Sequence, residues 1–108
     1  MSVPYRRVGL RCGDWAFDDI SLAVGFSARL VGMRRKDIDA VLLPVRSIHT
    51  WGMRQPIRVI GIDASGVVIA TAVVGPRSVV RWKVARWILE LPEGVPPPPI
   101  GHACTVLA

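Results

Sequence analysis

Short apolar segments separated by turn-forming residues run along most of the chain. Few of these segments are long enough for a helix, and several are rich in β-branched residues, which favour strands. We therefore expect roughly six to eight short strands. The candidate segments are residues 7–11, 20–24, 40–43, 47–50, 57–63, 67–74, 86–91 and 104–107.

The strongest of these elements is a hairpin formed by residues 57–63 and 67–74. The apolar window 57–75 is also about as long as a membrane-spanning helix. However, it contains Arg58 and Asp63, and the sequence Asp63-Ala64-Ser65-Gly66 is typical of a turn in which Gly66 takes a positive φ. Two strands and a turn are therefore predicted, and no membrane insertion.

One helix is expected near residues 27–36. Ser27 is typical of an N-cap, and Leu30, Val31 and Met33 can line one face of two turns. Arg34, Arg35 and Lys36 would follow in the last turn, where positive charge complements the helix dipole. The predicted fold is mainly β (α+β): a small barrel- or sandwich-like domain with one short helix.

The length and composition indicate one folded domain. The chain has 108 residues, of which 51% are hydrophobic and 20% charged, so it has enough apolar residues for a single core. We expect residues 1–108 to form one domain, with 95–101 as a proline-rich connector containing four consecutive prolines. Gly13, Asp14 and Asp18 interrupt the N-terminal region where a signal peptide would be apolar, which predicts a cytoplasmic protein.

The two cysteines carry no motif. Cys12 and Cys104 lie near opposite ends of the sequence, and neither belongs to a Cys-x-x-Cys pair. In a reducing compartment they are expected to be free thiols. Their distance in space stays open.

The charge balance favours anionic partners. Fourteen basic residues against eight acidic residues give a net charge of +6. Such a balance suits an acidic protein surface or a nucleic acid.

Four segments in order resemble a known family. They are Ala28 to Met33, Ile48 to Met53, Pro56 to Val68, and Ile88 to Gly94. The stretch 27–94 is similar to the domain-of-unknown-function family number 192 (uncharacterised protein family 0127), a set of small prokaryotic proteins. The resemblance implies a compact β-rich domain with a short helix, and it implies no activity. The sequence departs from the family at Arg58, where members usually have an aspartate, and it shows no secretion signal, which many members carry.

One candidate binding site lies between two apolar segments. It comprises the residues His49, Thr50, Trp51, Met53, Arg54 and Arg58. Trp51 and Met53 can supply apolar contacts, and the two arginines can hold an anion. The alternative is that Trp51 and Met53 cap the core while His49 bonds a backbone carbonyl.

A second candidate is a basic face that contains tryptophan. Its residues are Arg77, Arg81, Lys83 and Arg86, interleaved with Trp82 and Trp87. Phosphate contacts and base stacking would suit RNA or single-stranded DNA. Alternatively, Val80 to Val84 alternate as a half-buried strand does, and the charges merely solvate its outer face.

No catalytic or metal-binding motif is present. His49 and His102 are the only histidines, and neither has metal-ligand spacing, so no metal or cofactor is predicted. The most favoured function is a non-catalytic binding or protein-interaction module. A nucleic-acid-binding protein and a small enzyme with a pocket centred on His49 are the alternatives.

Overall fold

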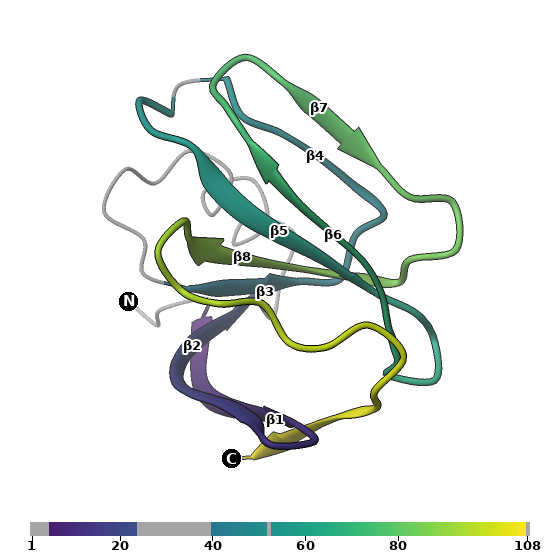
Figure 1. The fold of residues 1–108 in the computed structure, drawn as a ribbon. Helices are drawn as coiled ribbons and strands as arrows, with labels where there is room; N and C mark the ends of the chain where they lie inside the picture. The colour runs from purple at the N-terminus through teal and green to yellow at the C-terminus, as the bar shows by residue number, and fades with distance from the viewer. Residues whose placement is uncertain (1–4, 24–39, 52, 108) are drawn as a thin grey trace.

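The described part of the protein consists of β-strands. The computed structural model describes residues 5–23, 40–51 and 53–107, and these contain nine strands and no helix. The strands are β1 (Tyr5–Cys12), β2 (Trp15–Ala23), β3 (Val41–Leu43), β4 (Ser47–His49), β5 (Ile57–Ile62), β6 (Val68–Val74), β7 (Val79–Arg81), β8 (Trp87–Pro92) and β9 (Cys104–Leu107) (Figure 1).

The prediction of a mainly β domain is confirmed. Every segment predicted as a strand coincides at least in part with an observed one. β2 begins at Trp15, ahead of the predicted segment 20–24. The helix predicted near residues 27–36 lies outside the described residues.

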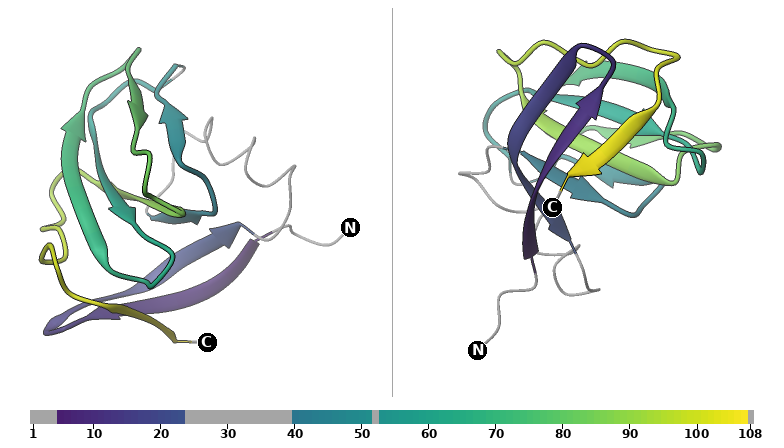
Figure 2. Two further views of the ribbon diagram at one scale, coloured as in Figure 1. Left: turned by 90° about the vertical axis from the view of Figure 1, so that its right-hand side faces the viewer. Right: turned by 90° about the horizontal axis from the view of Figure 1, so that it is seen from below.

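Seven strands form one curled sheet in the order β6-β5-β8-β3-β2-β1-β9. β2 and β3 pair in parallel, and all the other neighbours are antiparallel. Strands β1, β2 and β9 turn under the rest of the sheet, so that the sheet encloses an interior like a half-barrel (Figure 2).

The two edges of this sheet meet at one place. Val67, just before β6, forms an antiparallel bridge with Ala103, just before β9. Three backbone hydrogen bonds surround the bridge: from Cys104 to Gly66 (2.7 Å), from Gly101 to Val68 (2.8 Å) and from Val68 to His102 (3.0 Å). The closure protects edge groups that would otherwise be unpaired.

Both faces of the central strands are buried. One face encloses the barrel interior, with Leu42, Ile60 and Leu89 in its core. The other face, around Val59 and Ile88, is covered by Ile48, Val80 and Trp82 from the two-stranded sheet β4–β7. This double burial explains why β3, β5 and β8 are almost continuously apolar in sequence.

The predicted hairpin is present as β5 and β6. Asp63 Oδ1 accepts hydrogen bonds from the backbone N–H groups of Ser65 and Val67 (both 2.9 Å), and Gly66 has φ 84°. No helix among the described residues is long and apolar enough to cross a membrane.

The prediction of two free thiols is wrong. Cys12 and Cys104 form a disulfide, because β1 and β9 pair in a register that sets them directly opposite each other, with Cα atoms 4.3 Å apart. The sequence could not reveal this pairing, since the two residues are 92 positions apart and share no motif.

Candidate functional site

The two binding segments predicted from the sequence are brought together by the pairing of β4 with β7. Ser47 lies opposite Arg81, and His49 lies opposite Val79. A further backbone hydrogen bond, from Thr50 to Ser78 (2.9 Å), prolongs the pairing beyond the strands. Residues 47–51 and 77–83 therefore lie side by side and form one element.

Alternation along this two-stranded sheet separates an inner from an outer side. Ile48, Val80 and Trp82 face the core and pack against the seven-stranded sheet. The residues between them face outward, with every second position exposed from 77 to 83. We call this outer side, together with the exposed residues that directly adjoin the two strands, the ribbon face; it consists of Ser47, His49, Val79 and Arg81 in the strands and of Trp51, Arg77 and Lys83 beside them.

The ribbon face has an exposed apolar part. The side chains of Trp51 and Val79 are 51% and 65% exposed. The Trp51 and His49 rings lie edge to face, with centroids 5.7 Å apart. Clusters of large apolar side chains that are this exposed to solvent are typical of contact surfaces.

The ribbon face is also positively charged. Along the sequence, residues 40–62 and 64–89 contain no Asp or Glu. The basic residues in these two stretches are Arg46, Arg54, Arg58, Arg77, Arg81, Lys83 and Arg86. Among the described residues, Arg77, Arg81 and Lys83 of the ribbon face form no ion pair with a carboxylate, so the face attracts anionic groups.

Two of the predicted loop residues serve the fold instead of the surface. Thr50 is buried: its hydroxyl donates to Gly75 O (2.7 Å) and accepts from Ser78 N–H (2.8 Å), which ties the loop to the β6–β7 connection. Met53 packs partly buried against the core below the ribbon. Of the alternative in which Trp51 and Met53 cap the core, only the Met53 part matches this arrangement, because Trp51 is half exposed.

Arg58 does not join the loop. Its Nε donates to Val95 O (2.9 Å) and its Nη2 to Glu93 O (3.3 Å), both in the connection between β8 and β9. A guanidinium in this position holds the connection against the sheet. Arg58 therefore holds this connection in place of binding an anion together with Arg54, which is exposed.

Arg86 lies at the turn that leads from the ribbon into β8. Its backbone N–H donates to Ile62 O (2.8 Å) and its Nη1 to Ala85 O (3.2 Å), while the residue remains exposed. It therefore lies beside the ribbon face, not on it.

His49 is not among the residues that line the cavity inside the seven-stranded sheet, which is described below. Its Nδ1 is buried and has no hydrogen-bond partner among the described residues. Within that part of the chain, no three His, Cys, Asp or Glu side chains are grouped so that they could hold a metal ion.

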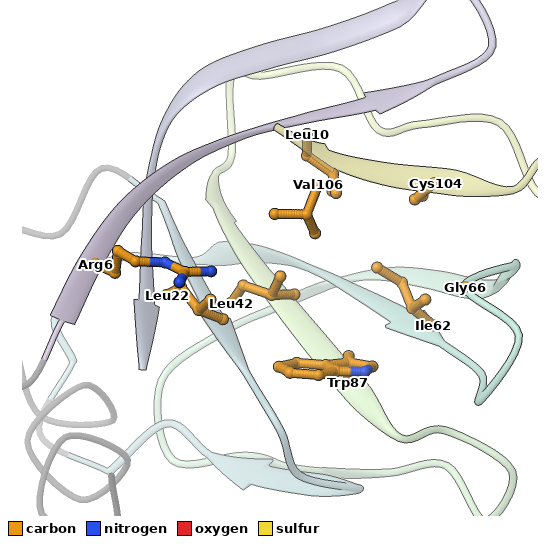
Figure 3. Close-up of a pocket in the computed structure, with 9 residues that line it drawn as sticks. All are labelled: Arg6, Leu10, Leu22, Leu42, Ile62, Gly66, Trp87, Cys104 and Val106. Carbon is orange, nitrogen blue, oxygen red and sulfur yellow. The ribbon is translucent and has the colours of Figure 1, made fainter. Parts of the chain in front are cut away.

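A cavity of about 230 Å³ lies inside the curl of the seven-stranded sheet. Its lining comes from β1, β2, β3, β5, β8 and β9: Arg6, Leu10, Leu22, Leu42, Ile62, Gly66, Trp87, Cys104 and Val106 (Figure 3). The lining is almost wholly apolar, and Arg6 is its one charged residue.

Glu90 is a second feature that the sequence analysis missed. It lies in β8 between Val41 of β3 and Val59 of β5, and only 2% of its side chain is exposed. Burial raises the pKa of Glu90 from 4.5 to about 7, and its Oε1 has no hydrogen-bond partner within the described residues. The sequence feature that could have indicated this burial is the position of Glu90 between Leu89 and Leu91 in an apolar segment.

No protein-family model and no curated protein matches the chain. A solved structure is similar to it: a protein of Sinorhizobium meliloti 1021, proposed as a transcription regulator, whose crystal structure was determined at 1.55 Å resolution. The two chains are 18% identical, the match covers 98% of each, and the TM-score is 0.75. At this identity the likeness shows the fold alone. The whole domain therefore has a counterpart among solved folds.

Proposed function

We propose that this domain is a non-catalytic binding module that contacts its partner through the ribbon face. The observation that carries the proposal is the pairing of β4 with β7. This pairing brings the segment that carries the exposed Trp51 next to the segment that carries Arg77, Val79, Arg81 and Lys83.

The chemistry of the ribbon face suits an acidic protein segment with an apolar anchor. Tryptophan and arginine are the residue types that most often dominate the binding energy of protein interfaces. Cations near them that have no ion-pair partner in the described part of the chain accelerate encounter with a negatively charged partner and orient it. The two features together favour a protein partner.

The test is an affinity pull-down from the native host with wild-type protein and two variants, Trp51→Ala and Arg81→Gln. Both side chains are exposed, so the variants should fold as wild type does. Arg11→Gln is the matched control, since Arg11 is exposed on β1, which lies in the other sheet. An acidic protein that persists after nuclease treatment, is retained by Arg11→Gln and is lost from both ribbon variants supports the proposal. A partner retained by both ribbon variants contradicts it.

Nucleic acid is the second candidate partner. It is favoured by the exposed Trp51 among cations, which can stack on a base, and by the proposed role of the Sinorhizobium protein as a transcription regulator. If Arg77, Arg81 and Lys83 each neutralise one phosphate, log affinity for a single strand falls with log salt at a slope of about −2. Fluorescence anisotropy with a single-stranded oligonucleotide measures this slope, and the Arg81→Gln variant should reduce it.

The family and the compartment predicted from the sequence also remain proposals. Residues 48–53, part of the resemblance to family number 192, overlap the ribbon face at His49 and Trp51. The redox state of Cys12 and Cys104 in cells tests the cytoplasmic location, because disulfides persist in oxidising compartments and are rare in the cytosol. Rapid thiol alkylation in intact cells should find Cys12 and Cys104 reduced if the location is cytoplasmic, and bonded if it is not.

A further inference from the structure

The cavity inside the curled sheet has one charged residue at an apolar wall. In β1 the side chains that point into the interior are those of Val8, Leu10 and Cys12, all buried. Arg6 occupies the next position of the same alternation, two residues before Val8, and it lines the cavity. An interior position that would ordinarily be apolar therefore carries a guanidinium.

The register across the sheet fixes the surroundings of Arg6. It lies opposite Leu22 of β2, which in turn lies opposite Leu42 of β3. Figure 3 shows the Arg6 side chain extending from β1 toward these two leucines, at one side of the space enclosed by the lining. Arg6 is exposed, so its charge lies at the mouth of the cavity and not in the core.

No carboxylate neutralises Arg6 within the described residues. The ion pair found there joins Arg7, its outward-facing neighbour, to Asp19 of β2. Asp18, the other acidic residue in the same part of β2, is exposed and lies beside Gly9. An arginine that has no acidic partner among the described residues and lies next to an apolar cavity is complementary to a ligand with one anionic group and an apolar body.

The cavity volume limits the size of that body. An apolar cavity of roughly 150 Å³ accommodates benzene, and the present one measures about 230 Å³. In proportion, it holds an apolar group of roughly eight to ten non-hydrogen atoms. Leu42, Ile62 and Trp87 supply the wall for such a group, and Val106, 46% exposed, stands beside the opening.

We propose that the interior of the curled sheet is a binding site for a small monocarboxylate with an apolar body of about eight carbons, its carboxylate held by Arg6 and its chain lying against Leu42, Ile62 and Trp87. This site is separate from the ribbon face. The cavity is formed by the seven-stranded sheet and the β5–β6 turn, and the ribbon face belongs to the two-stranded sheet.

Isothermal titration calorimetry with octanoate tests the proposal on the intact protein. We expect saturable one-to-one binding to wild type. A charge-assisted hydrogen bond is worth enough that Arg6→Gln should weaken octanoate binding by roughly tenfold to a hundredfold. Arg11→Gln, which removes an outward-facing arginine from the same strand, should bind octanoate as wild type does. Octan-1-ol has the same chain without the charge, so Arg6→Gln should leave its affinity unchanged.

A second variant tests where the chain lies. Val106→Trp enlarges a half-exposed residue at the cavity and should fill the space, abolishing binding of octanoate and of octan-1-ol alike. Its unfolding transition, followed by circular dichroism, shows whether the sheet remains intact. Absence of saturable octanoate binding to wild type would overturn the proposal. So would equal weakening by Arg6→Gln and Arg11→Gln, or undiminished binding to a folded Val106→Trp.

Discussion

At the scale of single residues, the most unusual side chain is Glu90. It lies between Val41 of β3 and Val59 of β5 with only 2% of its side chain exposed, and burial raises its pKa to about 7. The neutral acid is the form that the folded protein favours. A buried carboxyl of this kind makes stability depend on pH in the opposite sense to a carboxylate held by a cation.

The direction of this pH dependence follows from the number of protons that the folded and unfolded states bind. Between the unfolded value of 4.5 and the folded value of about 7, the unfolded chain holds fewer protons at this site than the folded one. The contribution of Glu90 to stability is therefore fully present below pH 4.5 and is lost as the pH rises to 7, by about 3 kcal/mol in all. Urea unfolding of wild type and of Glu90→Gln at pH 4 and pH 8 should show that the variant loses this fall.

The matched control for this experiment is Glu93→Gln. Glu93 is exposed in the turn after β8, so its replacement should leave the pH dependence of wild type intact. An equal fall in stability for wild type and Glu90→Gln would show that other groups cause it.

At the scale of elements, the contact between β5 and the ribbon depends on a glycine. A Cβ built at Gly61 would lie 2.6 Å from Cε3 of Trp82. The absence of a side chain at Gly61 therefore lets the Trp82 ring lie directly on the sheet. Trp82 is the inner residue next to Arg81, so this contact positions the outer face as well.

We expect Gly61→Ala to destabilise the protein by about 1–3 kcal/mol, because the tryptophan ring must move to admit the methyl group. Gly75→Ala should have little effect by comparison, since nothing lies within 4 Å of a Cβ at that position. Urea unfolding measures both changes.

A double-mutant cycle assigns the effect to the ring. In a Trp82→Ala background, the added methyl group has room, and the cost of Gly61→Ala should largely disappear. If the cost is the same in both backgrounds, the ring is not its cause.

These elements also show how far the sequence could predict the structure. The β5–β6 hairpin was predictable because its pattern and its turn are local: β-branched runs flank Asp63 and Gly66. The pairing of β4 with β7 was not, since some thirty residues separate partners whose own signals are only three residues long. For the same reason the sequence analysis kept residues 49–54 and 77–86 as rival sites, although the fold places parts of both on one surface.

Arg58 and Arg6 show the corresponding limit for the candidate sites. A charged residue in an apolar strand can bind a ligand or hold a loop, and the residues that decide between these roles are distant in sequence. For Arg58 they are the carbonyl groups of Glu93 and Val95. For Arg6 they are the cavity walls from five other strands.

At the scale of the whole molecule, the disulfide links the sheet's first strand to its last. A cross-link over 92 residues restricts the unfolded chain strongly, and loop entropy alone gives about 4–5 kcal/mol. The double replacement Cys12→Ala with Cys104→Ala should lower the free energy of unfolding by about this amount.

Reduction provides the comparison without a substitution. In urea unfolding, a reducing agent should lower the free energy of unfolding of wild type by a similar amount. The same agent should leave the free energy of unfolding of the double variant unchanged. Mass spectrometry under non-reducing conditions detects the bond directly, as a mass lower by two hydrogens. Indifference of wild type to the reducing agent would contradict a stabilising cross-link.

The order of strands in the sheet has a consequence for how the chain acquires its shape over time. β1 is made first, but its outer neighbour β9 follows some ninety residues later, and the bridge between Val67 and Ala103 needs that same late segment. During synthesis, the outer edge of β1 and the residue Val67 therefore remain unpaired until residues 103–107 have left the ribosome. Such distant pairings place folding in the slow range for small domains, about milliseconds to seconds. Until β9 pairs, the apolar residues that later line the cavity remain open to solvent on this side of the sheet.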